Sequence, residues 1–295
     1  MKPLLIFAAV FLTITPAQAG KHRTDIYREI TRTNEKSLRV HISGSFETIF
    51  INKGASDKVV TISKKSNDRS TSTVYVDYTI SNGIGDMEID LDRNGSKGED
   101  IRRNAPVAKA TFTNGDEGDW YITFSEDLPI DFDLEFDVGK ADVNLSGLQI
   151  TKFNLETGAS KVTVRSNIPN TKVIDDVTIE AGLGRFTSDH LGNLNFKKLS
   201  FEGGIGSYKL DLTGALRKDA EINAEIGMGS MTIILPNGTP VKMNCEDNWF
   251  NSCNFPRFVD RGEGEYSTEN IQSYPNHLKI NVECGVGSVS VKWRE

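Results

Sequence analysis

Residues 224–235 read AEIGMGSMTIIL, a stretch rich in Ile, Met and Thr that is typical of a β-strand, yet Gly227 and Gly229 interrupt it. Glycine weakens the interior of a strand, so two glycines in one strand need a structural reason. The same opening pattern occurs seven times along the chain. The first glycines of the seven copies are Gly83, Gly139, Gly158, Gly182, Gly204, Gly227 and Gly285.

The copies share apolar columns when they are aligned on the first glycine. The positions five and three residues before it, and four residues after it, are apolar in every copy, which is the period-two alternation of a half-buried strand. Steps of 24, 22 and 23 residues separate the four glycines from Gly158 to Gly227. Self-similarity at this period predicts a stack of coils. One interior column should contain Phe153, Val177, Leu199 and Ile222.

The apolar alternation changes phase once in each copy, so one residue must be absorbed in a bend or a bulge. The residue between the glycines is also apolar in most copies, as at Leu183 and Met228. We therefore place the change of phase at the second glycine and the residue after it. The glycines are expected to mark a corner where one strand ends and the next begins, because glycine tolerates unusual backbone angles and leaves room for the next coil.

The predicted fold is all-β and resembles a parallel β-helix, a solenoid with coils of about 22 residues. Each coil gives two short strands and two turns, and successive coils stack about 4.8 Å apart. Residues 20–295 form a single domain with insertions near 92–130 and 237–277. The first insertion contains a predicted hairpin that turns at Asn114–Gly115. Residues 38–51, LRVHISGSFETIFI, form a degenerate coil.

The first residues of the 295-residue chain predict export. Lys2, the apolar run from Leu4 to Ile14 and the triplet Ala17-Gln18-Ala19 are typical of a signal peptide, here residues 1–19. No later stretch has the 18 apolar residues of a membrane span. The formal charge of −7 becomes −8 without Lys2, which argues against nucleic acid and anionic membrane surfaces as partners. We expect the protein in the periplasm, on the cell surface or outside the cell.

The chain has three cysteines, and an exported protein can form disulfides. Cys245 and Cys253 lie in one predicted loop with seven residues between them, so we expect them to pair. The third, Cys284, takes an apolar position of the alignment and is expected to be a buried, inert thiol. A reactive Cys284 is the alternative, although no His or other base lies near it in sequence. The aligned positions in other copies are Val138, Ala181 and Ile226.

An acidic position stands two residues before the first glycine in six copies. If the coils stack, these carboxylates form a ladder on the outer face with one acid in each layer. Backbone N–H groups at the corner and alternating charges four residues earlier would offset their repulsion. The structural interpretation is corner capping and solubility, and the functional alternative is cation binding or docking of a basic partner. The ladder comprises Asp137, Glu156, Glu180, Glu202, Glu225 and Glu283.

Other motifs give weaker signals. Asp90, Asp92 and Asn94 match the start of an EF-hand loop, but Ile101 stands where calcium needs a bidentate Glu, so a turn is favoured. The four histidines have no metal-ligand spacing. There is no G-x-S-x-G motif. The G-x-G pairs precede strands rather than helices, so they are not dinucleotide loops. The sequence predicts no cofactor and no catalytic residue.

Two stretches resemble the bacterial toast-rack family and the related "putative adhesin" and cell-wall stress-response domains. The first runs from Trp120 to Val164 and includes LEFDVGKADVNLSGLQITKFNLETGASKVTV, and the second runs from Gly264 to Val291. The resemblance implies a right-handed β-helix-like fold and an envelope location, and it supplies no catalytic residues. The insertion that holds Cys245 and Cys253 departs from the family pattern, and it is a candidate for a role of its own.

The sequence therefore predicts a non-catalytic, exported adhesion, scaffold or envelope-interaction module. Its partner would be an envelope protein, a glycan or another copy of the chain. The alternative is a carbohydrate-active enzyme, a polysaccharide lyase or hydrolase, because such enzymes also use β-helices with outward carboxylates. Acids at 131, 133, 135 and 137 share one outward face, but every half-solvated strand alternates in this way. No acid stands in an obvious environment that would raise its pKa.

Overall fold

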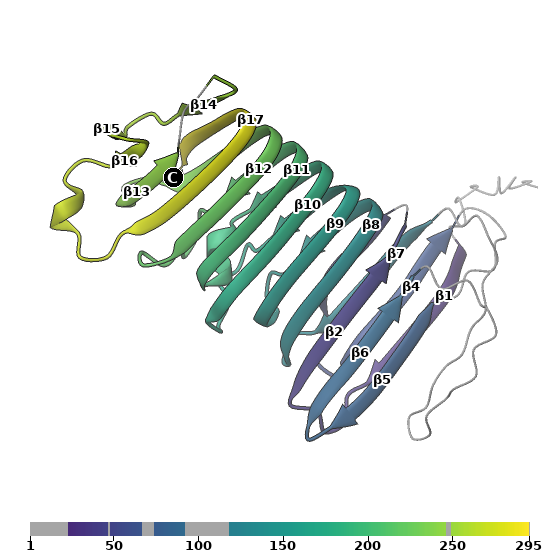
Figure 1. Cartoon of the computed structure of the whole chain (residues 1–295). Coiled ribbons are helices and arrows are strands. Elements are labelled where there is room, and N and C mark those ends of the chain that lie inside the picture. The colour runs from purple at the N-terminus through teal and green to yellow at the C-terminus, as the bar shows by residue number, and fades with distance from the viewer. Residues whose placement is uncertain (1–22, 47, 67–73, 92–117, 246–248, 295) are drawn as a thin grey trace, which may run out of the picture.

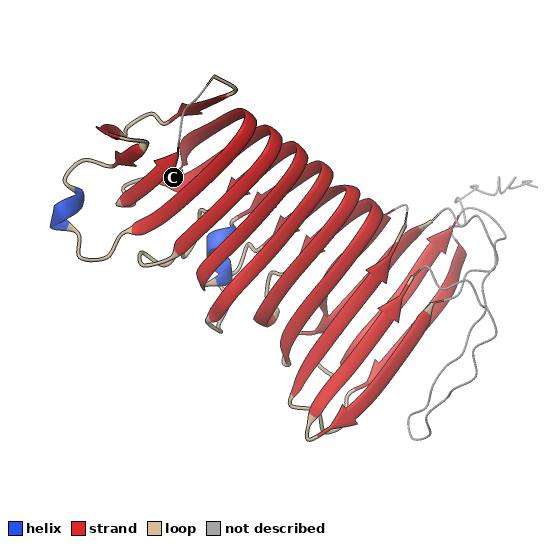
Figure 2. Ribbon diagram, in the orientation of Figure 1, coloured by secondary structure: helices blue, strands red, loops and turns tan. Residues whose placement is uncertain are grey.

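Seventeen strands form one open β-sheet in the part of the chain that the computed structural model describes, which is residues 23–46, 48–66, 74–91, 118–245 and 249–294 (Figures 1 and 2). The helical segments of these residues are two short 3-10 helices, η1 (Leu191–Leu194) and η2 (Ile271–Ser273). No helix there is long and apolar enough to cross a membrane. The all-β prediction is confirmed. The predicted signal peptide, the Asn114–Gly115 turn, Asp92 and Asn94 lie outside the described residues.

Six long strands stack in parallel through the middle of the molecule and lie side by side in Figure 1. Each strand runs through one copy of the glycine pattern. Short return segments such as 190–195 connect the first five strands, and the longer segment 237–277 lies between the fifth and the sixth. In order, the strands are β8 (Pro129–Asn144), β9 (Gln149–Arg165), β10 (Ile174–Asp189), β11 (Phe196–Asp211), β12 (Glu221–Pro236) and β17 (Leu278–Arg294).

The core lies between the two arms of the bent strands. Phe153, Val177, Leu199 and Ile222 pair with one another in register and are each at most 1% exposed, so the predicted interior column is confirmed. Phe201 on the first arm packs against Tyr208 on the second, with ring centroids 5.3 Å apart. Burying a large apolar side chain contributes about 1.5–3 kcal/mol, so these columns hold the two arms together.

The glycines bend a strand rather than end one, and the prediction of two strands per coil is wrong. Hydrogen-bonded pairing continues through the corner, where Gly206 pairs with Gly184 and Gly229. Burial changes phase once between Ala181 and Phe186, as expected, but Leu183 is already exposed, so the change begins before the predicted position, the second glycine. The strand stays continuous because glycine accepts the backbone angle of the bend: φ is +134° at Gly229.

Two of the seven copies are aligned wrongly by the sequence pattern. Gly83 lies in the hairpin turn between β5 (Tyr75–Ser81) and β6 (Ile84–Asp90), where Asn82 and Gly83 both have positive φ. An Asn-Gly pair with positive φ at both residues is the favoured two-residue hairpin turn. In β8, Gly139 pairs with Ser160 and therefore takes the second glycine position. The alignment of this copy therefore shifts by two residues. The error arose because a single glycine can be aligned with either the first or the second glycine of the pattern.

The N-terminal end closes the parallel stack with antiparallel strands. β2 (Ser37–Gly44) and β3 (Thr48–Gly54) pair in parallel with the two arms of β8, so residues 38–51 continue the parallel stack. Beyond them, β1 pairs with β4, β4 with β7 and β5 with β6, all antiparallel. Residues 119–130, which we assigned to an insertion, lie in β7 and at the start of β8, so they are part of the sheet. The additional bounds are β1 (Arg23–Thr31), β4 (Lys58–Ser66) and β7 (Asp119–Ser125).

The insertion at 237–277 forms an incomplete extra layer over the last long strand. β13 (Val241–Cys245) and β14 (Asn251–Asn254) pair in parallel with β17, along the edge that β12 leaves free. β15 (Val259–Gly262) and β16 (Glu265–Ser267) continue this layer as an antiparallel pair. The predicted disulfide is confirmed between Cys245 and Cys253. Cys284 is free and only 7% exposed, and burial raises the pKa of its thiol.

Candidate functional site

The outer side of the bend carries three rows of side chains, each with one member in each of the six long strands, and we call this surface the outer corner. The acidic row contains Glu135, Glu156, Glu180, Glu202, Glu225 and Glu283. The apolar row contains Val138, Ala159, Leu183, Ile205, Met228 and Val286. The mixed row contains Lys140, Lys161, Arg185, Ser207, Ser230 and Ser288.

The apolar row faces solvent, although the sequence pattern placed its residues in the apolar alternation of the core. Leu183 is 54% exposed and Ile205 53%, and the row's Val and Met members lie between 43% and 54%. Five of the twelve exposed large apolar side chains of the described residues belong to it. At about 4.8 Å per strand, the six members extend over about 24 Å. An exposed apolar strip of this kind is a candidate contact surface.

The acidic row runs beside the apolar row and differs from the predicted ladder at one end. Glu135, not Asp137, pairs with Glu156, because Asp137 takes the first glycine position of its copy. The remaining five acids stack in register as expected. Burial raises the pKa of Glu180, and the neighbouring carboxylates of Glu202 and Glu156 raise it further. Within the described residues, no Lys or Arg lies within ion-pair distance of these five carboxylates.

The charges four residues before the row alternate between adjacent strands, as predicted. Asp176 pairs with Lys198, Lys198 with Glu221 and Glu221 with Lys279. In β8 the partner of Lys152 is Asp131 rather than the predicted Asp133, which is the same shift of two residues. This alternation balances the charges of its own row, while the acidic row keeps its mutual repulsion.

Replacing Glu180 with Gln should stabilise the protein at neutral pH. A carboxyl whose pKa is raised by folding destabilises the folded state above that pKa, and the penalty disappears as pH falls through it. We expect Glu180→Gln to raise the Tm at pH 7 by about 1–2 °C, measured by circular dichroism. The difference from the wild type should vanish below about pH 4. Glu263→Gln, in an exposed turn, is the control, and a Tm difference for Glu180→Gln that does not change with pH would contradict the prediction.

A His-carboxylate cluster lies at the N-terminal end of the acidic row. Ligand atoms of His41, Asp133 and Glu135 lie within 4.8 Å of one another, on β2 and β8. His41 Nδ1 is 3.3 Å from Asp133 Oδ2, so a hydrogen bond between the two side chains explains why they lie close together. These residues could hold a divalent cation with their three atoms. Sequence spacing missed the cluster because His41 and Asp133 are 92 residues apart. Asp90, at the end of β6, is the described member of the calcium candidate, which stays a prediction.

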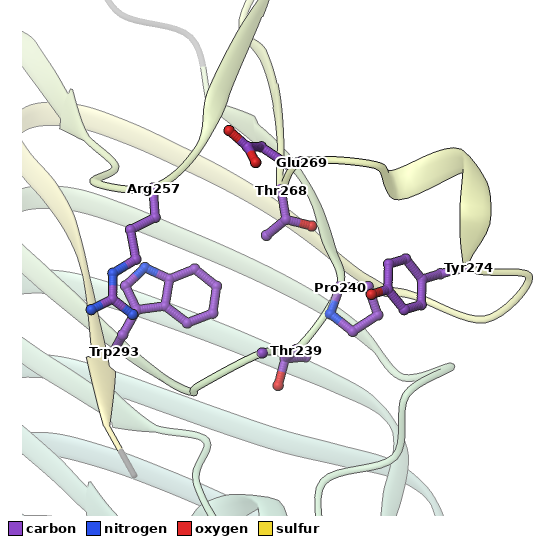
Figure 3. Close-up of a pocket in the computed structure, with 8 residues that line it drawn as sticks. Thr239, Pro240, Arg257, Thr268, Glu269, Tyr274 and Trp293 are labelled. Atoms are coloured by element: carbon purple, nitrogen blue, oxygen red, sulfur yellow. The ribbon is translucent and has the colours of Figure 1, made fainter.

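A pocket of about 210 Å³ opens at the C-terminal end of the sheet (Figure 3). Its wall comes from the 237–277 insertion and from the end of β17, which contributes Trp293. The repeat pattern sets this insertion apart but indicates no residue of the pocket, because the contributing segments are distant in sequence. The lining residues are Gly238, Thr239, Pro240, Arg257, Thr268, Glu269, Tyr274 and Trp293.

Comparison with protein families gives one match that covers most of the chain. The sequence matches the model of the N-terminal domain of toast_rack, DUF2154, over residues 18–189 and 170–234. No curated protein matches the sequence.

Several solved structures match this chain at low sequence identity. A "putative cell adhesion protein" from Clostridium sporogenes is 17% identical with a TM-score of 0.43, and the match covers 91% of this chain and 98% of that chain. A "putative adhesin" from Bacteroides fragilis is 12% identical with a TM-score of 0.37, over 90% of this chain and 96% of that chain.

Proposed function

This chain belongs to the family of the N-terminal toast_rack domain, and on that premise we propose that it is an exported, non-catalytic interaction module of the adhesion or scaffold type. Residues 1–19 would direct export. The outer corner would bind an envelope protein. The exposed apolar row carries this proposal, because its large side chains face solvent instead of the core.

The charges beside the apolar row define the complementary surface of the partner. The acidic row favours a partner whose basic side chains lie opposite the whole length of this row. The mixed row favours acidic side chains at its N-terminal half, where Lys140, Lys161 and Arg185 stand, and hydrogen-bonding groups opposite the serines. We therefore propose a protein partner with an apolar stripe between a basic flank and a partly acidic one, because charge complementarity sets orientation and specificity.

The finer architecture is part of the same proposal. We infer that the six long strands and their return segments form a right-handed β-helix-like solenoid with repeats of about 22 residues. The register supports this, since Glu156, Glu180 and Glu202 are paired neighbours and stand 24 and 22 residues apart. A stack of equivalent repeats presents equivalent side chains as straight rows, which suits recognition of an extended surface.

The location of the acids favours binding over catalysis. Ligands and substrates usually occupy concave sites with a few convergent polar groups. The acidic row instead follows the outside of a bend, with one carboxylate on each strand. Asp175, an outward acid of β10, forms an ion pair with Lys197 at 2.6 Å. These observations support a non-catalytic module over the carbohydrate-active enzyme.

Binding to an isolated envelope fraction of the producing bacterium tests the proposal. We expect the wild type to cosediment with this fraction and the Leu183→Asp/Ile205→Asp double variant to bind at least tenfold more weakly, because two charges would have to be buried. Ile168→Asp is the matched control, since Ile168 is 52% exposed but lies outside the row. Protease treatment of the envelope fraction should abolish binding of the wild type.

Four outcomes would contradict the proposed function. The first is equal binding by the double variant and the wild type. The second is binding that survives protease treatment, which would indicate a glycan. The third is self-association that depends on the row, without envelope binding, in sedimentation velocity. The fourth is turnover of any polysaccharide in a panel assayed for released reducing ends, which would favour the enzyme.

A further inference from the structure

We propose that the C-terminal pocket binds a single pyranose ring of a neutral carbohydrate. This site is formed by the 237–277 insertion and β17, so it is separate from the outer corner and goes beyond the proposed function. The inference depends on three features of the pocket: a fixed aromatic surface, polar groups that keep hydrogen-bonding capacity for a ligand, and a balanced charge.

Trp293 supplies the fixed aromatic surface. Its Nε1–H donates a hydrogen bond of 2.9 Å to the Pro256 carbonyl, and its ring centroid is 5.6 Å from that of Phe258. These contacts hold the indole in one orientation before any ligand arrives, which lowers the entropic cost of binding. The face of an aromatic ring carries partial negative charge and attracts the partly positive C–H hydrogens of a sugar ring. Tyr274, 47% exposed, gives a second aromatic side chain (Figure 3).

The polar side chains of the pocket are available to sugar hydroxyls. Arg257 and Glu269 have opposite charges and line the same small pocket, yet they form no ion pair in the described residues. Arg257 donates one hydrogen bond, from Nη1 to Asn237 Oδ1, which leaves its other N–H groups available to a ligand. Thr268 Oγ1 accepts a hydrogen bond from the Val241 N–H, so its own O–H is free to donate. Neighbouring sugar hydroxyls can accept from Arg257 and donate to Glu269.

Charge and size narrow the class of ligand. One guanidinium and one carboxylate balance each other, so the pocket favours a neutral ligand over an anionic or cationic one. A volume of about 210 Å³ is below the range of about 300–1,000 Å³ of sites for drug-sized ligands, which suits one sugar ring rather than a folded peptide segment. The lining thus combines apolar and aromatic surface with a few polar groups that fix orientation, as small-molecule sites do.

Saturation-transfer NMR and titration calorimetry with neutral methyl pyranosides, together with methyl glucuronide as an anionic probe, test this inference. We expect at least one neutral pyranoside to bind with a Kd on the order of 1 mM or below. Glu269→Gln should weaken binding about tenfold without lowering the Tm, because a hydrogen bond to a charged group is lost. Tyr274→Phe should weaken it less, because this change keeps the ring and removes only a phenolic O–H that can bond to a sugar hydroxyl. Trp293→Ala should abolish binding, and Trp249→Ala, on a 99% exposed side chain of another loop, should not change it.

The result separates this site from the outer corner. The Leu183→Asp/Ile205→Asp variant should bind the pyranoside like the wild type, so failure of one proposal leaves the other standing. If Trp293→Ala unfolds the C-terminal layer, Glu269→Gln and Tyr274→Phe decide the question. The inference is overturned if no neutral pyranoside binds, if the glucuronide binds more tightly than every neutral sugar, or if binding is unchanged in Glu269→Gln and Tyr274→Phe.

Discussion

Gly229→Ala should destabilise the protein by about 3–5 kcal/mol, a fall in Tm of about 10 °C. Gly229 has φ of +134°, in a region that an L-residue with a Cβ occupies only at a cost of about 1–3 kcal/mol. A Cβ at this position would also overlap the carbonyl oxygen of Gly206 on the neighbouring strand. Both atoms belong to backbone, so relief requires β11 and β12 to separate at the bend.

Gly262→Ala is the matched control for this prediction. Gly262 also has a positive φ, +88°, but a Cβ there would meet nothing within 4 Å. It should cost about 1 kcal/mol from backbone strain alone. Urea unfolding followed by circular dichroism measures both variants. Equal losses in the two variants would show that backbone angle, and not the close approach of neighbouring strands, requires glycine at the corner.

The interior columns could be predicted from sequence because period-two burial requires apolar side chains at alternate positions. Phe153, Val177, Leu199 and Ile222 therefore followed from the alignment alone. The continuity of the strand could not, because it depends on hydrogen bonds between neighbouring strands that leave no mark in composition. The shift in β8 has a similar cause, since Gly139 satisfies either glycine position and only its pairing with Ser160 decides between them.

The surface sites were harder to predict than the core. The residue type alone does not show that Leu183 is exposed, because leucine is usually buried. Its outward direction follows from the geometry of the bend between two glycines. The pattern itself misleads here, because Leu183 continues the alternation of Val177, Ile179 and Ala181 and yet faces solvent. The acidic row was visible because its spacing repeats with the glycines. The pocket was not, because Arg257, Glu269 and Trp293 meet only after the 237–277 insertion folds back over β17.

Phe201→Ala should destabilise the protein strongly and Ile205→Ala hardly at all, although the two residues lie only four positions apart on β11. Phe201 is 1% exposed and its ring centroid is 5.4 Å from that of Phe186, so its truncation should cost about 3–5 kcal/mol in the free energy of unfolding. Ile205 is 53% exposed, and its truncation should stay within about 0.5 kcal/mol of the wild type.

The contrast bears directly on the outer corner. If Ile205→Ala leaves urea unfolding unchanged while weakening attachment to the envelope fraction, then the apolar row contributes to contact and not to folding. A loss for Ile205→Ala close to that of Phe201→Ala would contradict this, because the row would then pack as part of the core. Measuring both variants by urea unfolding separates the two cases. A core side chain is already shielded from water in the free protein, whereas a contact side chain on the same strand stays exposed to water until a partner binds.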